Sequence, residues 1–187
     1  MNKMRKGWFK IPGVQDGDRT LEDQMKGLGW LFANVKNNTV LDVGCAEGLL
    51  SIELAARYGA KSVHGVEVVA DHVVMANKLK GSKLPITFEC ADMNKWRPKK
   101  KYDIVVALAI LQKLKDPGAV AAALANCAHE AIVLRLPPEH APTVIDARSN
   151  NVPHHIGEIL RASDFTQIEQ SYDGHFGEYV GVWRRGG

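Results

Sequence analysis

The residues from Thr39 to Gly48 have the types and the spacing to bind a ligand. They begin as a short apolar run, which is typical of a strand buried on both faces, and they break into a turn at Gly44. A helical pattern follows over residues 49–58, and Gly59 is placed to cap its end. A helix that starts after such a turn offers unpaired N–H groups to an anionic or strongly polar ligand group. Glycine at position 44 also lets a ligand approach the backbone closely.

A second chemical signal lies at the end of the next predicted strand. That strand covers Ser62 to Val66 and is followed by Glu67, about twenty residues beyond the glycine turn. A carboxylate at this place in a βαβ unit can accept hydrogen bonds from the two hydroxyls of a ribose. Turn and carboxylate together predict a cofactor that contains a nucleoside.

The spacing of the turn residues disfavours a dinucleotide. The dinucleotide fingerprint has the form Gly-x-Gly-x-x-Gly, whereas this chain has Ala46 at the second glycine position and lacks the third glycine. Glu47 would also bring a negative charge close to a pyrophosphate. A cofactor without phosphates therefore fits better, and a Rossmann-type oxidoreductase that binds a nucleotide is the alternative.

In these residues the chain resembles the class I S-adenosylmethionine-dependent methyltransferases, whose motif reads hydrophobic-Asp/Glu-x-Gly-x-Gly-x-Gly. Asp42, Gly44, Ala46 and Gly48 align with this motif, and Ala46 departs from it. The stretch from Leu108 to Pro117 is similar to the segment that these enzymes carry after their fourth strand. The resemblance implies methyl transfer from S-adenosylmethionine, with S-adenosylhomocysteine as product, to an oxygen, nitrogen or sulfur nucleophile. A protein that binds the cofactor without catalysis is a further alternative.

The resemblance also implies which residues hold the cofactor. Asp92, directly after the third strand, would accept a hydrogen bond from the adenine amino group, and Met93 would contact the ring. Cys45 is expected to be a small buried residue near the cofactor rather than a nucleophile. The expected cofactor-binding residues are Asp42, Gly44, Cys45, Ala46, Gly48, Glu67, Val68, Asp92, Met93 and Ala107.

The sequence defines the methyl acceptor less closely. It lacks the Asp/Asn-Pro-Pro-Tyr/Phe signature of amino methyltransferases and the aspartate that a 2′-O RNA methyltransferase carries after the fourth strand. A small-molecule acceptor is the first expectation, and nucleic acid and protein acceptors stay open. Displacement at a sulfonium needs no acid for the leaving group, so the sequence assigns no catalytic residue. His140, His154 and His155 lie where a general base could stand, while His64 and His129 are expected to be structural.

The composition is that of one globular domain. The 187 residues carry a formal net charge of +3, which is too weak to indicate a nucleic-acid partner, and 45% of them are hydrophobic. No apolar run is long enough to span a bilayer, and no secretory signal follows the basic N-terminus. The three cysteines are far apart, and His154 and His155 are adjacent, so we expect neither a disulfide framework nor a metal site. The expected location is the cytoplasm, without membrane contact.

The elements that must position these residues alternate between strand and helix. The expected fold is a Rossmann-like three-layer α/β sandwich with a mostly parallel seven-stranded sheet. Its last two strands are expected to form an antiparallel hairpin. The predicted strands cover 39–43, 62–66, 86–90, 102–107, 131–136, 165–171 and 178–184, and the predicted helices 49–58, 70–80 and 118–127.

Two parts are predicted along the chain. Residues 37–187 form the methyltransferase-like domain, and residues 1–36 form an N-terminal arm and helix. Residues 3–19 of the arm look irregular and hold Trp8 and Phe9 in a basic run, and a helix is predicted from Thr20 to about Val35. The arm either rests its aromatic side chains on the domain or acts as a lid over the cofactor or as a contact for the substrate.

Overall fold

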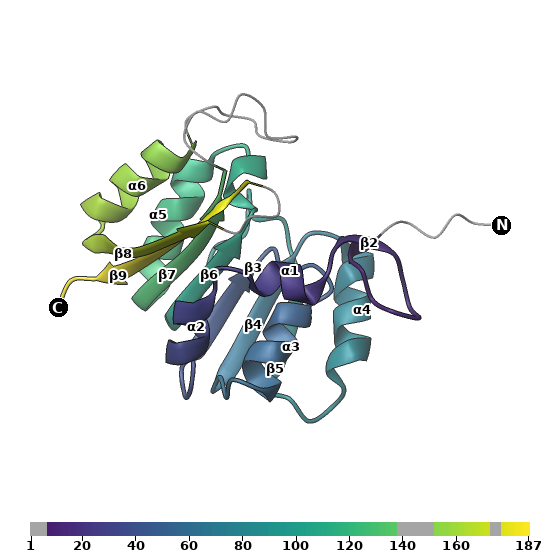
Figure 1. The fold of residues 1–187 in the computed structure, drawn as a ribbon. Helices are drawn as coiled ribbons and strands as arrows, with labels where there is room; N and C mark the ends of the chain where they lie inside the picture. The colour runs from purple at the N-terminus through teal and green to yellow at the C-terminus, as the bar shows by residue number, and fades with distance from the viewer. Residues whose placement is uncertain (1–6, 138–151, 173–176) are drawn as a thin grey trace.

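A seven-stranded sheet forms the centre of the computed structural model, which describes residues 7–137, 152–172 and 177–187 (Figure 1). Its strands are β3 (Thr39–Val43), β4 (Ser62–Glu67), β5 (Ile86–Cys90), β6 (Tyr102–Leu108), β7 (Ala128–Leu136), β8 (Phe165–Tyr172) and β9 (Tyr179–Arg185). Their spatial order is β5-β4-β3-β6-β7-β9-β8. The strands from β5 to β7 are parallel, whereas β9 runs antiparallel to both β7 and β8. The predicted fold class, including the antiparallel C-terminal hairpin, is confirmed.

Helices cover both faces of this sheet (Figure 1). On one face lie α5 (Pro117–Cys127) and α6 (Val152–Ala162), and on the other lie α2 (Gly29–Asn34) and α3 (Leu49–Ala56), with α4 (Ala70–Lys80) beside α3. Successive residues of a strand point to opposite faces. Leu41 and Val43 of β3 therefore join the core under α5, whereas Val40 joins the core under α3. Asp42 shares the face of Val40, and this places its carboxyl against α3.

Several strand boundaries differ from the prediction, most of them by one residue. Strand β4 includes Glu67 as its last residue, and β7 begins at Ala128 instead of Ala131. The register between β6 and β7 shifts between Tyr102 and Ile104. Such a bulge absorbs an extra residue in one strand and interrupts the alternation of side chains, so the polar start of β7 did not show the pattern of a strand.

The N-terminal region is more ordered than the sequence predicted. The short strands β1 (Gly7–Phe9) and β2 (Gly17–Arg19) pair in parallel, where irregular chain was expected. The single helix predicted to run to Val35 is wrong, because the chain forms α1 (Leu21–Met25) and α2 with Gly27 between them.

Tertiary contacts explain this break. Gly27 has a left-handed φ of +74°, and a Cβ on it would lie 3.0 Å from Val180 Cγ2. The predicted start at Thr20 is correct, since its hydroxyl caps α1 in a reciprocal pair with Asp23. None of the helices in the described ranges combines the length and the apolarity that a membrane span requires.

Candidate cofactor site

The loop between β3 and α3 folds through three left-handed residues. The φ angles are +73° at Gly44, +48° at Ala46 and +72° at Gly48. Ala46 therefore keeps the backbone conformation of the glycine that the motif expects at its position, at an energetic cost that glycine avoids. A Cβ on Gly48 would lie 2.4 Å from the ring of Phe88, and one on Gly44 would lie 3.1 Å from Ile110 Cγ1. Close packing within the protein thus requires glycine at position 48 and restricts a side chain at position 44.

Backbone hydrogen bonds tie this loop to the end of β4. The N–H groups of Gly44 and Cys45 donate to the carbonyl oxygen of Val66, at 2.8 and 3.2 Å. The N–H of Ala46 donates to Glu67 Oε2 at 3.1 Å. The glycine turn and the predicted ribose carboxylate, which are separated in the sequence, therefore form one rigid unit.

Glu67 is held by main-chain donors on both of its oxygens. Besides the bond from Ala46, its Oε1 accepts from the N–H of Val69 at 2.9 Å. The residue is 8% exposed. Each carboxylate oxygen has room for a second donor, so Glu67 is oriented by the protein and can still accept from a ligand hydroxyl.

Asp42 lies beneath the loop and is buried. Its Oδ2 accepts from Ser51 Oγ at 2.6 Å, which links β3 to the first turns of α3. Burial raises the pKa of Asp42 from 3.8 to about 6, and the negative charge of Glu67 adds to the rise, although the Ser51 hydrogen bond lowers it. Cys45 is buried beside it, and burial raises the pKa of its thiol well above 9.0. A thiol with such a pKa stays protonated and is a poor nucleophile.

The structure distributes the other predicted cofactor residues unevenly. Asp92 Oδ1 accepts from both the backbone N–H and the side-chain nitrogen of Asn94, at 2.9 and 2.7 Å. These bonds lower the pKa of Asp92 and close the turn after β5. Met93 and Ala107 are buried in one core cluster, whereas the side chain of Val68 is 56% exposed. The side chains of Met93 and Ala107 are therefore packed in the core, and that of Val68 faces solvent.

Known proteins resemble this chain in sequence and in fold. A family model described as a methyltransferase domain matches residues 40–130. The ubiquinone biosynthesis O-methyltransferase of Rhodopseudomonas palustris (strain HaA2) is 34% identical over 91 residues, covering 48% of this chain and 34% of that enzyme. The chain thus matches about a third of this relative's length.

A solved structure extends the likeness over most of the fold. Magnesium protoporphyrin IX methyltransferase (ChlM) from Synechocystis PCC 6803, with bound SAM, is 25% identical with a TM-score of 0.70, covering 85% of this chain and 76% of that one. The same enzyme with bound SAH is 23% identical with a TM-score of 0.72, covering 85% and 80%. The family model, the relative and the solved structure all support a class I S-adenosylmethionine-dependent methyltransferase.

This methyltransferase fold carries its N-terminal arm directly on the glycine loop. Glu47 is fully buried and accepts from the N–H groups of Trp8 and Phe9, at 2.9 and 3.1 Å, and from Gln15 Nε2 at 2.7 Å. Glu47 was expected to repel a pyrophosphate; its carboxylate instead binds the arm. Phe9 packs with Ile11 on Ala46. The arm therefore rests on the domain, as one of the two interpretations expected.

The segment after β6 meets the arm from the other side. It contains the 3₁₀ helix η1 (Leu111–Lys113), and Lys113 Nζ lies 4.3 Å from the centre of the Trp8 ring. Asp116 then caps α5 by accepting from the N–H of Ala119 at 2.8 Å. The arm and this segment thus border the glycine loop on two sides.

A buried polar network fixes α1 against the far strands, and sequence reasoning missed it. Arg19 Nη1 and Arg135 Nη1 both donate to Gln24 Oε1, at 3.0 and 2.9 Å. Arg135 Nη2 donates to the carbonyl oxygens of Gln24 and Lys26, at 2.9 and 2.8 Å. Arg19 Nη2 pairs with Glu178 Oε2 at 3.1 Å. The only signal in the sequence was an arginine inside the apolar run of β7.

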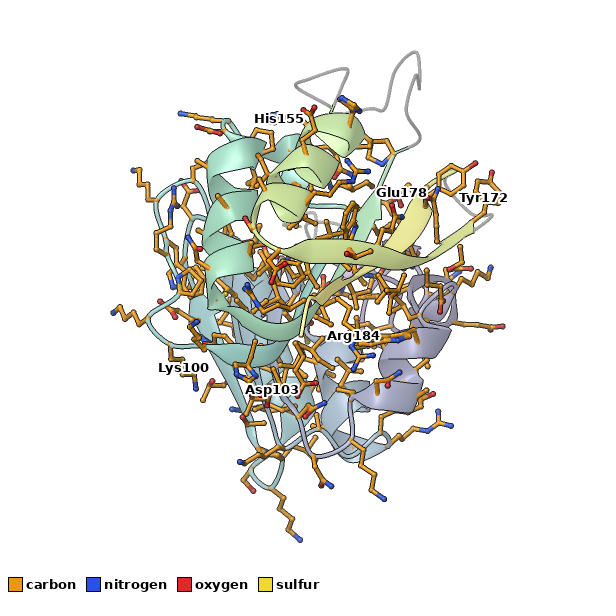
Figure 2. All side chains as sticks on the ribbon, turned by 90° about the vertical axis from the view of Figure 1, so that its left-hand side faces the viewer. Lys100, Asp103, His155, Tyr172, Glu178 and Arg184 are labelled. Atoms are coloured by element: carbon orange, nitrogen blue, oxygen red, sulfur yellow. The ribbon has the colours of Figure 1, made fainter. Side chains whose placement is uncertain are left out.

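Two of the three histidines considered as bases lie on α6 instead of in a loop. His140 lies outside the described residues. His154 and His155 are exposed on α6, where His154 Nε2 lies 3.3 Å from Glu158 Oε1. Figure 2 shows His155 at the opposite end of the molecule from Asp103, which is near the start of β6, so His155 lies toward the carboxyl ends of the parallel strands, where it was expected. His64 bonds the hydroxyl of Tyr102 at 2.6 Å, as a structural residue would.

A cavity of about 420 Å³ lies elsewhere, under α6 and against the hairpin. Residues that line it include Leu136, His154, Arg161, Tyr179 and Trp183. None of the predicted cofactor-binding residues lines it, and β6 and β7 separate it from β3. It is therefore distinct from the glycine-loop site.

Proposed function

We propose that this chain binds S-adenosylmethionine at the glycine loop and transfers its methyl group to an oxygen, nitrogen or sulfur nucleophile of a small molecule. The observation that carries the proposal is the direct bond from the glycine loop to the ribose carboxylate, Ala46 N–H to Glu67 Oε2 at 3.1 Å. This bond fixes a hydroxyl acceptor beside a helix start. A sulfonium nucleoside with an amino-acid tail needs both groups at once.

The residues at the loop fit such a cofactor. Glu67 offers its remaining lone pairs to the ribose hydroxyls. The start of α3 suits a carboxylate, since Gly48 brings no capping side chain and the first turn holds no acid. Asp92 Oδ1 is engaged by Asn94, so an adenine amino group would use Oδ2.

The reaction requires the protein mainly to position the nucleophile and to exclude water from the site. When bound, S-adenosylmethionine supplies a methyl group activated by the sulfonium, and the leaving group is a neutral thioether. The chain must hold the nucleophile in line with that methyl and exclude water. We assign this task to the arm and to the Leu108 to Pro117 segment, which border the loop. The arm then has the lid role that its packing allows.

Two observations support a small acceptor. The relative and the solved structure described above are named for ubiquinone biosynthesis and for magnesium protoporphyrin IX, and both names refer to small molecules. Within the described residues, the borders of the loop are a short arm and a single-turn 3₁₀ helix, which suit a compact acceptor. We place the reaction in the cytoplasm.

Calorimetric titration tests the cofactor. We expect wild-type protein to bind S-adenosylhomocysteine and not NAD. The variant Glu67→Gln keeps the size of the side chain but loses its charge, and it should bind S-adenosylhomocysteine about tenfold more weakly. Glu158→Gln on the exposed face of α6 is the matched control and should bind like wild type. Binding of NAD without S-adenosylhomocysteine would refute the proposal.

Methyl transfer itself needs a separate assay. Tritiated S-adenosylmethionine should label a fraction of small phenols, amines or thiols in the presence of the protein, and Gly44→Val should abolish the label. A protein that binds the cofactor but labels none of these acceptors would contradict the catalytic part of the proposal and leave binding alone.

A further inference from the structure

We propose that His72, in the first turn of α4, is a second ribose-binding residue that grips a cofactor hydroxyl together with Glu67. This inference rests on the proposed function, because it concerns the same ligand. It goes further by adding a specificity residue that the motif does not contain and by connecting the ribose to the N-terminal arm.

The imidazole of His72 lies between two buried carboxylates. Its Nε2 is 3.4 Å from Glu47 Oε1, and its Nδ1 is 4.0 Å from Glu67 Oε1. The side chain is 21% exposed, but Nδ1 itself is buried and has no hydrogen-bond partner among the described residues. A buried polar nitrogen without a partner costs free energy unless something fills the place.

The separation between the two groups fits one hydroxyl. At 4.0 Å, Nδ1 and Glu67 Oε1 are too far apart to bond each other. An oxygen that is about 2.8 Å from each atom can lie between them. A ribose hydroxyl can donate to Glu67 and accept from a protonated Nδ1. The adjacent hydroxyl of the diol can alternatively donate to a neutral Nδ1. His72 can therefore form a hydrogen bond with the diol in either protonation state.

Glu47 is the group that orients the ring. When Nε2–H donates toward Glu47, Nδ1 becomes the acceptor that faces Glu67. Glu47 itself is fixed, since it is fully buried and also accepts from Trp8, Phe9 and Gln15. The ring therefore lies against a carboxylate that the protein holds in place.

The same contacts connect the ligand to the arm. The imidazole ring would lie between a hydroxyl bonded to His72 and the carboxylate of Glu47. Glu47 in turn accepts hydrogen bonds from the backbone N–H groups of Trp8 and Phe9. Occupation of the ribose position restrains the ring and, through it, the carboxylate that anchors the arm. The arm should therefore close more firmly when the sugar is bound.

The test separates a ribose contact from a merely structural role. Affinities are measured by calorimetry for S-adenosylhomocysteine and for its 2′-deoxy and 3′-deoxy analogues. Wild-type protein should bind one deoxy analogue about 3- to 10-fold more weakly than S-adenosylhomocysteine, which is the value of one hydrogen bond. His72→Gln can reach toward Glu47 but carries no nitrogen at the place of Nδ1, so it should discriminate less than wild type and keep only the part that Glu67 supplies.

A second variant keeps the proposal falsifiable. The amide of His72→Asn reaches about the place of Nδ1 with an oxygen that accepts or a nitrogen that donates, so this variant should keep most of the discrimination. His129→Gln, exposed at the start of β7, is the matched control and should behave like wild type. The inference is overturned if Gln and Asn discriminate alike, or if His72→Gln weakens all three ligands equally. Failure of wild type to bind S-adenosylhomocysteine at all would instead overturn the proposed function itself.

Discussion

The raised pKa of Asp42 predicts that the free energy of unfolding depends on pH, and the pKa difference gives the size of this dependence. The carboxyl is buried under the glycine loop, and its pKa rises from 3.8 to about 6 on folding. Below pH 3.8 both the folded and the unfolded chain hold this proton. Between pH 3.8 and 6 the unfolded chain releases it while the folded chain keeps it, so rising pH favours unfolding. The pKa difference is worth about 3 kcal/mol at 1.36 kcal/mol for each unit.

The variant Asp42→Asn removes this titration and keeps an oxygen that can accept from Ser51 Oγ. We therefore expect the free energy of unfolding of the variant, minus that of wild type, to increase by about 2 kcal/mol from pH 4 to pH 7, since part of the change falls below pH 4. Urea unfolding followed by far-ultraviolet circular dichroism at several pH values in this range measures the difference. Groups that do not interact with Asp42 titrate alike in both proteins and cancel in the subtraction.

Asp92 supplies a control of opposite sign. Hydrogen bonds from Asn94 lower its pKa in the folded state, so its charged form stabilises the fold above the unfolded pKa and this contribution is lost as the pH falls. The difference for Asp92→Asn should therefore fall as the pH rises, opposite to that for Asp42→Asn. A difference for Asp42→Asn that stays constant between pH 4 and pH 7 would refute the reasoning. It would mean that the buried carboxyl ionises at an ordinary pH.

Three further predictions concern the arm, the network and the loop. Glu47→Gln should speed hydrogen exchange at the amides of Trp8 and Phe9, which donate to this carboxylate; unchanged exchange there, with Glu53→Gln as control, would rule out the anchor. Arg135→Met should lower the free energy of unfolding by about 3 kcal/mol, because three buried acceptor contacts lose their donor. Arg184→Met on the same sheet is exposed and should cost under about 0.5 kcal/mol, so equal losses would contradict the assignment. Gly48→Ala should destabilise by about 2 kcal/mol or more, since its Cβ would meet Phe88 at 2.4 Å; a neutral effect in urea unfolding would show that the loop can move aside.

Much of the fold could be predicted because its signals are local. The buried run of β3, the turn at Gly44 and the cap of α1 at Thr20 depend on residues that are near one another in the chain. Even so, Gly27 shows the limit of such signals. Its left-handed φ breaks the expected helix because Val180, distant in the sequence, leaves no room for a Cβ.

Local signals likewise predict one part of the candidate site, whereas tertiary contacts decide the other. The positions of the glycine loop and of Glu67 follow from the order of strands and helices, because parallel strands end at the same edge of a sheet. The partners of the buried charges do not follow from this order. Glu47 looked like an obstacle to a phosphate, and only the packed arm shows that its carboxylate binds the backbone of Trp8 and Phe9.

The sequence by itself therefore determined the class of the fold, the glycine loop and the carboxylate at the end of β4. Turn chemistry and hydrophobic periodicity act over a few residues, and a sequence displays them directly. Tertiary structure alone decided that His72 lies between Glu47 and Glu67, and that Arg135 meets Gln24. The partner of a buried charge or imidazole can lie far away in the sequence. The spacing of residues along the chain therefore does not show which two side chains are close in space.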